Sequence, residues 1–202
     1  MYPAPRSYVD LAERSRTDVN PDLRVLVENA LGTFEGGRFQ EFCLDFLPIY
    51  HARFEGLARL GHTAAGKTRA GTPDLLVTAG ERQIAVQCGT ERDYWPSEKS
   101  VAASKPYRDA MDCVKTLTHL AEIVLVTNRE TPPNAPNVRA AISAAVNQQT
   151  TATVTLLGLE DLGQYLVGNI DEPRIVTLIA HYFPIVGRVL EKIGRASCRE
   201  RV

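Results

Sequence analysis

The sequence lacks the residue patterns that define disulfide-rich proteins, zinc ribbons and membrane proteins. Its 202 residues contain four cysteines, none of them in a C-x-x-C pair, and four histidines, no two of which form a pair with metal-ligand spacing. No nucleophile-elbow motif is present, so serine-based and cysteine-based catalysis have no candidate. There is also no signal peptide and no apolar run of about eighteen residues, so we expect a cytoplasmic protein that does not enter a membrane.

The charge balance is close to neutral. A formal net charge of −1 gives no overall attraction to nucleic acid, so a surface that binds DNA must be a local patch. With 44% hydrophobic and 23% charged residues, the chain is expected to form one globular domain over residues 22–193. Residues 1–21 are expected to form an N-terminal arm, and residues 194–202 resemble translated vector sequence rather than a native ending.

Two neighbouring strand patterns carry the most informative residues. A short apolar run over residues 75–77 and a second run rich in β-favouring residues over 83–91 are separated by Ala79, Gly80 and Glu81, which is typical of a β-hairpin. Asp74 opens the first strand and Gln87 lies late on the second. A carboxylate and a second oxygen ligand could therefore meet across the two strands, and Mg²⁺ is commonly held in this way.

At these residues the chain resembles the PD-(D/E)XK nuclease superfamily, and in particular its Mrr-like restriction-endonuclease branch. The resemblance is carried by Pro73-Asp74 and by Val86-Gln87-Cys88. It implies an α/β restriction-endonuclease-like fold with a mixed central sheet flanked by helices. It also implies hydrolysis of DNA phosphodiester bonds with Mg²⁺ or Mn²⁺, with Asp74 as a metal ligand and Gln87 as a second metal-site residue.

The resemblance further implies a lysine two positions after Gln87, where this chain has Gly89. A displaced lysine could take over the task of stabilising charge that develops on the phosphate. Lys105 is preferred over Lys99 because it stands near the start of an expected helix, whose positive end favours phosphate. For any one of these lysines, an ordinary solvated surface residue is the preferred interpretation. The alternative is a nuclease fold that has lost catalysis and serves as a nucleic-acid-binding or assembly module.

Two glutamates are further candidates for the metal site. Members of this superfamily often add a glutamate from the helix that precedes the hairpin, which points to Glu41, with Gln40 as its neighbouring candidate. A solvent-exposed helix carboxylate is an equally good interpretation of Glu41. Glu91 shares the strand face of Gln87 and is a possible extra ligand.

Several basic and aromatic residues near the hairpin are candidates for contact with nucleic acid. Lys67 and Arg69 stand just before Asp74 and could contact a phosphate backbone, and Arg92 follows the hairpin. Aromatic faces can stack on bases, which makes candidates of Tyr94 and of Trp95, the only tryptophan. The alternative for Trp95 is that it covers an edge of the core.

Residues 61–68 match the phosphate-binding pattern G-x-x-x-x-G-K-[ST]. That loop works between a buried strand and a helix, because loop amides and the helix N-terminus hold the phosphates together. Here a helical pattern precedes the motif and a strand pattern follows it, so nucleotide binding is only a second alternative.

The rest of the chain alternates between helical and strand patterns, as expected for a crossover fold. Apolar spacing predicts helices over residues 22–31, 38–47, 49–60, 105–117, 138–149 and 158–166, and strands over residues 121–128 and 152–157. Residues 170–193 are apolar, are interrupted by Pro173 and Pro184, and are expected to supply a closing helix with Ile175, Leu178 and Ile179. By analogy with the family, the domain could be the N-terminal effector module of a larger antiphage defence protein with a downstream ATPase or sensor domain, and could act on DNA as a homodimer.

Overall fold

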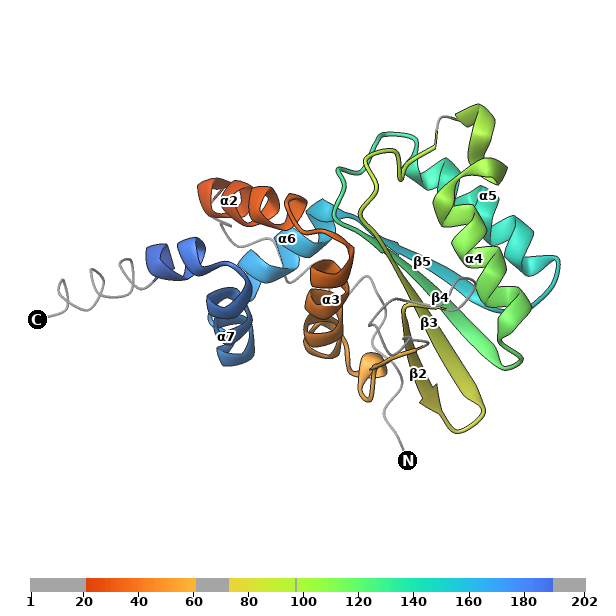
Figure 1. The fold of residues 1–202 in the computed structure, drawn as a ribbon, viewed down its shortest axis with the longest axis horizontal. Helices are drawn as coiled ribbons and strands as arrows, with labels where there is room; N and C mark the ends of the chain where they lie inside the picture. The colour runs from red at the N-terminus through yellow and green to blue at the C-terminus, as the bar shows by residue number, and fades with distance from the viewer. Residues whose placement is uncertain (1–20, 61–72, 97, 191–202) are drawn as a thin grey trace, which may run out of the picture. The chain divides into compact units, whose positions relative to one another are not determined.

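The computed structural model describes residues 21–60, 73–96 and 98–190 of the chain (Figure 1). Contacts divide the chain into two compact units. One unit covers Leu31–Glu160, and the other combines the residues before it with those after it. Lys67, Arg69 and the loop 61–68 lie outside the described residues, as do the arm 1–20 and the tail 194–202.

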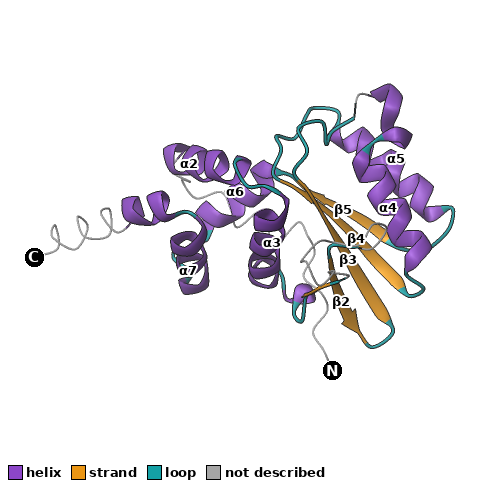
Figure 2. Cartoon of the chain, viewed as in Figure 1, coloured by secondary structure: helices purple, strands orange, loops and turns teal. Residues whose placement is uncertain are grey.

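A five-stranded mixed sheet forms the centre of the first unit (Figure 2). Its strands follow one another across the sheet in chain order: β1 (Ala58–Arg59), β2 (Leu75–Ala79), β3 (Arg82–Gly89), β4 (Leu120–Thr127) and β5 (Thr153–Leu157). β2 pairs antiparallel with both β1 and β3, whereas β4 pairs parallel with both β3 and β5. An α/β architecture with a mixed sheet flanked by helices is therefore confirmed.

The expected hairpin is formed by β2 and β3. Gly80 makes the turn with φ of 62°, a conformation that glycine adopts without steric cost. The register pairs Leu75 with Val86, and continuing it by one residue places Asp74 opposite Gln87. The sequence pattern thus positioned both candidate residues at the same level of the sheet.

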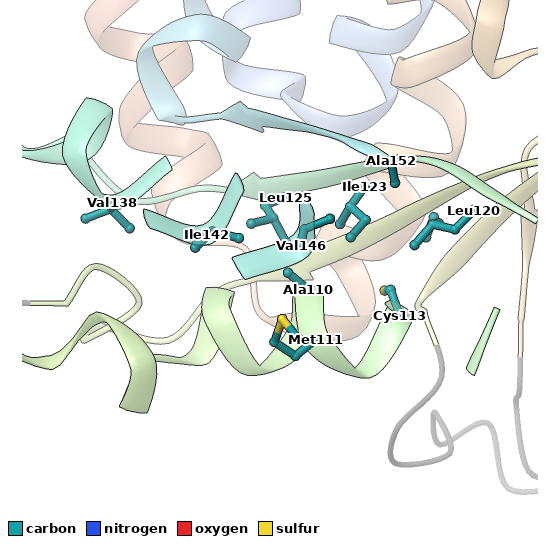
Figure 3. Close-up of a cluster of buried hydrophobic side chains, with 11 residues drawn as sticks. Ala110, Met111, Cys113, Leu120, Ile123, Leu125, Val138, Ile142, Val146 and Ala152 are labelled. Atoms are coloured by element: carbon teal, nitrogen blue, oxygen red, sulfur yellow. The ribbon is translucent and has the colours of Figure 1, made fainter. Parts of the chain in front are cut away.

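Helices α4 (Lys105–Thr116) and α5 (Ala135–Asn147) cover one face of the sheet. Each follows a strand and leads to the next parallel strand, because parallel neighbours need a long connection. Their apolar stripes close a core against β3, β4 and β5 (Figure 3). The fully buried members of this core are Ala85, Ala110, Cys113, Ile123, Leu125, Ile142 and Val146.

Helix α3 (Gly36–Tyr50) contacts β3. Its Cys43 lies against Cys88 of β3, whose side chain points away from α4. Its buried stripe is the expected one: Phe39, Phe42, Cys43, Phe46 and Leu47. The helix continues through Pro48, but the predicted helix over 49–60 is wrong. His51 is extended, and its Nδ1 accepts a hydrogen bond from the Arg53 amide at 3.0 Å, which caps the short 3-10 helix Ala52–Phe54 before β1.

The second unit contains helices α2 (Pro21–Gly32), α6 (Leu159–Gly168) and α7 (Pro173–Tyr182), of which α2 and α6 begin or end in the first unit. The closing helix expected within residues 170–193 is α7, and its buried face includes the expected Ile175, Leu178 and Ile179. Helix α7 ends at Tyr182, and a further helical segment occupies 184–190, because Pro184 has no amide hydrogen to continue the ladder. None of the helices in the described ranges has the length and apolarity needed to cross a bilayer.

Candidate functional site

Asp74 is held at the start of β2 by hydrogen bonds from two other elements. Its Oδ1 accepts from Gln40 Nε2 of α3 at 2.7 Å, and its Oδ2 accepts from the backbone amide of Cys88 in β3 at 2.8 Å. Only 8% of the residue is exposed. Both carboxylate oxygens are therefore fixed in direction by donors that come from sequence positions far from Asp74.

The environment of Asp74 makes its charge costly. Burial raises the pKa of the Asp74 carboxyl above its ordinary value, while the hydrogen bond from Cys88 and the positive charge of Lys105 oppose that shift. A buried carboxylate of this kind is stabilised by any further positive charge placed beside it. Perturbed carboxyls of this type are enriched at functional sites.

Gln87 lies across from Asp74 in the continued register of β2 and β3, and its side chain faces α4. It is 6% exposed, and its Nε2 contacts Cys113 Sγ at 3.5 Å. Burial raises the pKa of the Cys113 thiol to about 12, and the charge of Asp74 also acts on this thiol. The hydrogen bonds of Asp74 therefore come from α3 and β3, whereas the contact of Gln87 is with α4.

Lys105 lies among three carboxylates at the start of α4. Its Nζ lies 2.8 Å from Asp109 Oδ2 and 3.7 Å from Glu91 Oε1, and its charge reaches Asp74. Burial by itself lowers the pKa of Lys105, but the hydrogen bond to Asp109 and the charges of Asp109, Glu91 and Asp74 outweigh it, and the pKa is raised. Lys105 therefore remains charged at neutral pH and is paired with Asp109 and Glu91.

Asp109 belongs to the group of charged residues around Lys105, although the sequence pattern did not identify it as a candidate site residue. Burial raises the pKa of the Asp109 carboxyl, and the hydrogen bond from Lys105 opposes the shift. Its spacing of four residues from Lys105 on an amphipathic helix was the available signal, since such pairs face each other. The lysine–carboxylate pair lies on the side of α4 that faces β3.

Gln40, rather than Glu41, is the α3 residue that reaches Asp74. Glu41 Oε1 forms an ion pair with Arg59 at 3.1 Å, and its side chain is 57% exposed. Adjacent helix positions are about 100° apart, so only one of the two can point toward β2. The structure thus brings Gln40 to Asp74 and leaves Glu41 at the surface.

The residues expected to contact nucleic acid differ in how much of each side chain is exposed to solvent. Tyr94 is fully buried, so its ring has no face open to a base, contrary to the expectation. Trp95 is half-buried and lines an open cleft of about 310 Å³ together with Glu91, Lys105 and Arg108. Arg92 is exposed. The side chain of Lys99 lies outside the described residues.

The donor set limits how a metal ion could bind. In the part of the chain that the structure describes, no three acidic, histidine or cysteine side chains converge as a metal cage. Mg²⁺ does not require one, because it commonly keeps several waters and binds through one or two carboxylates and substrate phosphate. Asp74 is the buried carboxylate that could hold such an ion, whereas the contact shown for Gln87 is with Cys113 of α4 and the structure shows no contact between the two side chains.

Comparisons of the chain with protein-family models, with curated proteins and with solved structures gave no match.

Proposed function

We propose that this chain is a Mg²⁺- or Mn²⁺-dependent nuclease of the PD-(D/E)XK type that hydrolyses DNA phosphodiester bonds. The observation that carries the proposal is the pairing of a buried, doubly hydrogen-bonded Asp74 with the firmly charged Lys105 in its electrostatic range. Asp74 precedes β2 and Lys105 begins α4, and the mixed α/β sheet flanked by helices is the general architecture that the proposal requires.

Each residue would have a distinct task. A bound divalent cation would lower the pKa of a coordinated water and polarise the scissile phosphate. Asp74 would hold that cation, and Gln40 and the Cys88 amide keep its carboxylate oriented. Lys105 would pair with the negative charge that develops on the phosphate, because its ammonium is partly buried and already close to the carboxylates.

The open cleft beside Lys105 supports a nucleic-acid substrate. Arg108 is exposed at its rim, and Trp95 contributes aromatic surface to it. Guanidinium groups bind phosphate, and aromatic side chains stack on bases without regard to sequence. Because Glu91 and Asp93 also line the cleft, a cation at the site would reduce their repulsion of a phosphate backbone.

Nicking of supercoiled plasmid DNA tests this proposal. Wild-type protein with Mg²⁺ or Mn²⁺ is expected to nick the plasmid, and Asp74→Ala to lose on the order of 10²-fold or more of that rate. Asp112→Ala is the matched control, because Asp112 lies on the surface of α4 and pairs with Lys115. Nicking that survives chelation or the Asp74 substitution would refute the proposal.

One observation favours a second candidate, a nuclease fold without catalysis. The strand position that the family uses for its lysine is Gly89, and a side chain there would overlap the Tyr94 ring. DNA binding without cleavage, unchanged by Asp74→Ala, would support a binding or assembly module instead.

A further inference from the structure

The open cleft beside the start of α4 has the size of a site for one small ligand. Its volume is about 310 Å³, at the lower end of the range for small-molecule sites. Two segments of the unit Leu31–Glu160 line it: residues 91–96 after β3, and the start of α4 from Ala103 to Arg108. A base that is paired and stacked inside a duplex cannot enter such a space, whereas an unpaired base can.

Contacts with other elements fix both segments that line the cleft. The Pro96 carbonyl accepts a hydrogen bond at 3.3 Å from Asn134 Nδ2, and Asn134 stands at the start of α5. The Trp95 ring packs edge-on against the fully buried Tyr94, with centroids 5.7 Å apart. Ser104 caps α4 through its hydroxyl, which accepts a backbone amide of the first helical turn at 3.4 Å. The cleft is therefore formed before a ligand enters, and binding needs little reorganisation.

Trp95 offers the cleft an apolar surface. The residue is half-buried, and its indole N–H is buried without a hydrogen-bond partner among the described residues. Because this N–H is the only polar atom of the side chain, the part of the indole that is exposed is carbon. Aromatic carbon of this kind binds the face of a base by stacking, whichever base it is.

The charges of the cleft suit an unpaired nucleotide better than the backbone of a duplex. Lys105 is already paired with Asp109 at 2.8 Å and lies 3.7 Å from Glu91, which leaves the exposed Arg108 as the second cation of the lining. Proteins that follow a duplex place several cations along its phosphates. Glu91 and the exposed Asp93 would repel such a backbone, but carboxylates accept hydrogen bonds from the N–H groups at the edge of a base. Those N–H groups are free only when the base is unpaired.

We infer that the cleft binds one unpaired nucleotide and that single-stranded DNA is therefore the substrate. The base stacks on Trp95, and Arg108 pairs with a neighbouring phosphate. The choice of DNA as the ligand rests on the proposed function, whereas the shape and lining of the cleft do not depend on Asp74. Nicking of supercoiled plasmid agrees with this substrate, because negative supercoiling favours local opening of the duplex.

The fluorescence of Trp95 is a direct readout, because the chain has no other tryptophan. The full chain is titrated with a single-stranded oligodeoxynucleotide of about 12 nucleotides in EDTA, which prevents cleavage by removing divalent cations. We expect quenching of the indole emission at saturation, and binding of the blunt duplex of the same sequence that is weaker by about tenfold or more. Unchanged emission at saturation, or equal affinities for the single strand and the duplex, would overturn the inference.

Substitutions in the lining test the two contacts separately, with the anisotropy of a labelled oligodeoxynucleotide as the readout. Trp95→Ala should weaken binding about 5- to 150-fold, and Trp95→Phe, which keeps a ring, should restore much of the affinity. Arg108→Met lies on the surface and leaves the core intact, and it should reduce the slope of log affinity against log salt by about 0.7. Arg139→Met is the matched control, because Arg139 is an exposed arginine of α5 outside the cleft. Full affinity of Trp95→Ala, or equal slopes for Arg108→Met and Arg139→Met, would overturn the inference.

The binding and nicking assays separate this inference from the proposed function. If the wild-type protein binds the single strand with quenching of Trp95 but cleaves nothing in Mg²⁺ or Mn²⁺, the nuclease proposal fails and the assignment of the cleft stands. If nicking depends on Asp74 but DNA leaves the Trp95 emission unchanged, the nuclease proposal stands and the inference is overturned. Relaxed plasmid that is nicked as fast as supercoiled plasmid would also overturn it.

Discussion

Lys105→Met removes a positive charge that lowers the pKa of both Asp74 and Asp109. The Lys105–Asp109 pair has a distance of 2.8 Å, and its side chains are 29% and 17% exposed. Hydrogen bonds between charged groups contribute about 1.5–3 kcal/mol when buried and exposed ion pairs about 0.2–1 kcal/mol. For this intermediate burial we expect the free energy of unfolding to fall by about 1–2 kcal/mol at neutral pH.

The loss should depend on pH in a defined direction. The folded-state pKa values of Asp74 and Asp109 are raised, so these acids favour folding below their unfolded-state pKa and this contribution is lost as pH rises through the folded-state values. The positive charge of Lys105 reduces this loss of folding stability, because it stabilises both ionised carboxylates. Its removal should therefore cost most at neutral pH and progressively less as the solution becomes acidic and both carboxyls are protonated.

Urea denaturation of wild type and Lys105→Met across the acidic to neutral range measures this dependence. Lys115→Met is the matched control, since Lys115 forms an ion pair with Asp112 on the same helix at 3.2 Å but is 67% exposed. We expect the control to lose at most about 0.5 kcal/mol. A Lys105→Met cost that is the same at every pH, or no larger than that of the control, would refute the argument that Lys105 lies in a cluster of carboxylates.

Two further predictions concern residues that the fold brings to the sheet. Gln40→Ala should lower Mg²⁺-dependent plasmid nicking about tenfold or more, because it releases the Asp74 carboxylate, whereas Glu41→Gln on the neighbouring position should leave the rate unchanged. Equal effects of the two substitutions would contradict the assignment. Asn128→Ala should destabilise the protein by about 2–3 kcal/mol in urea denaturation, because its buried amide donates at 2.8 Å to the backbone carbonyls of Leu31 and Phe34. Asn169→Ala should cost less than about 1 kcal/mol, because Asn169 is only half-buried and donates to one carbonyl. If Asn128→Ala lowered the free energy of unfolding only slightly, water would have to donate to the two carbonyls in place of the Asn128 amide.

The strand and helix patterns were readable because each depends on residues close together in the chain. The hairpin, the buried strand β4 and the helices after it follow from runs and spacings of apolar residues. The segment 49–60 misled the same reasoning. Its apolar spacing is compatible with a helix, but an extended His51 with its cap to Arg53 ends α3 and starts a different element.

What the sequence determined by itself was the identity of Asp74, Gln87 and Lys105 as candidates and their places on two strands and a helix start. The tertiary structure alone decided that Gln40 reaches Asp74, that Asp109 joins Lys105, and that the Tyr94 ring lies over Gly89. The physical reason is that periodicity fixes the direction of a side chain only relative to its own helix or strand. Which side chains then meet depends on how α3, α4 and the segment after β3 pack around the sheet, and packing joins residues such as Gln40 and Asp74 that are 34 positions apart.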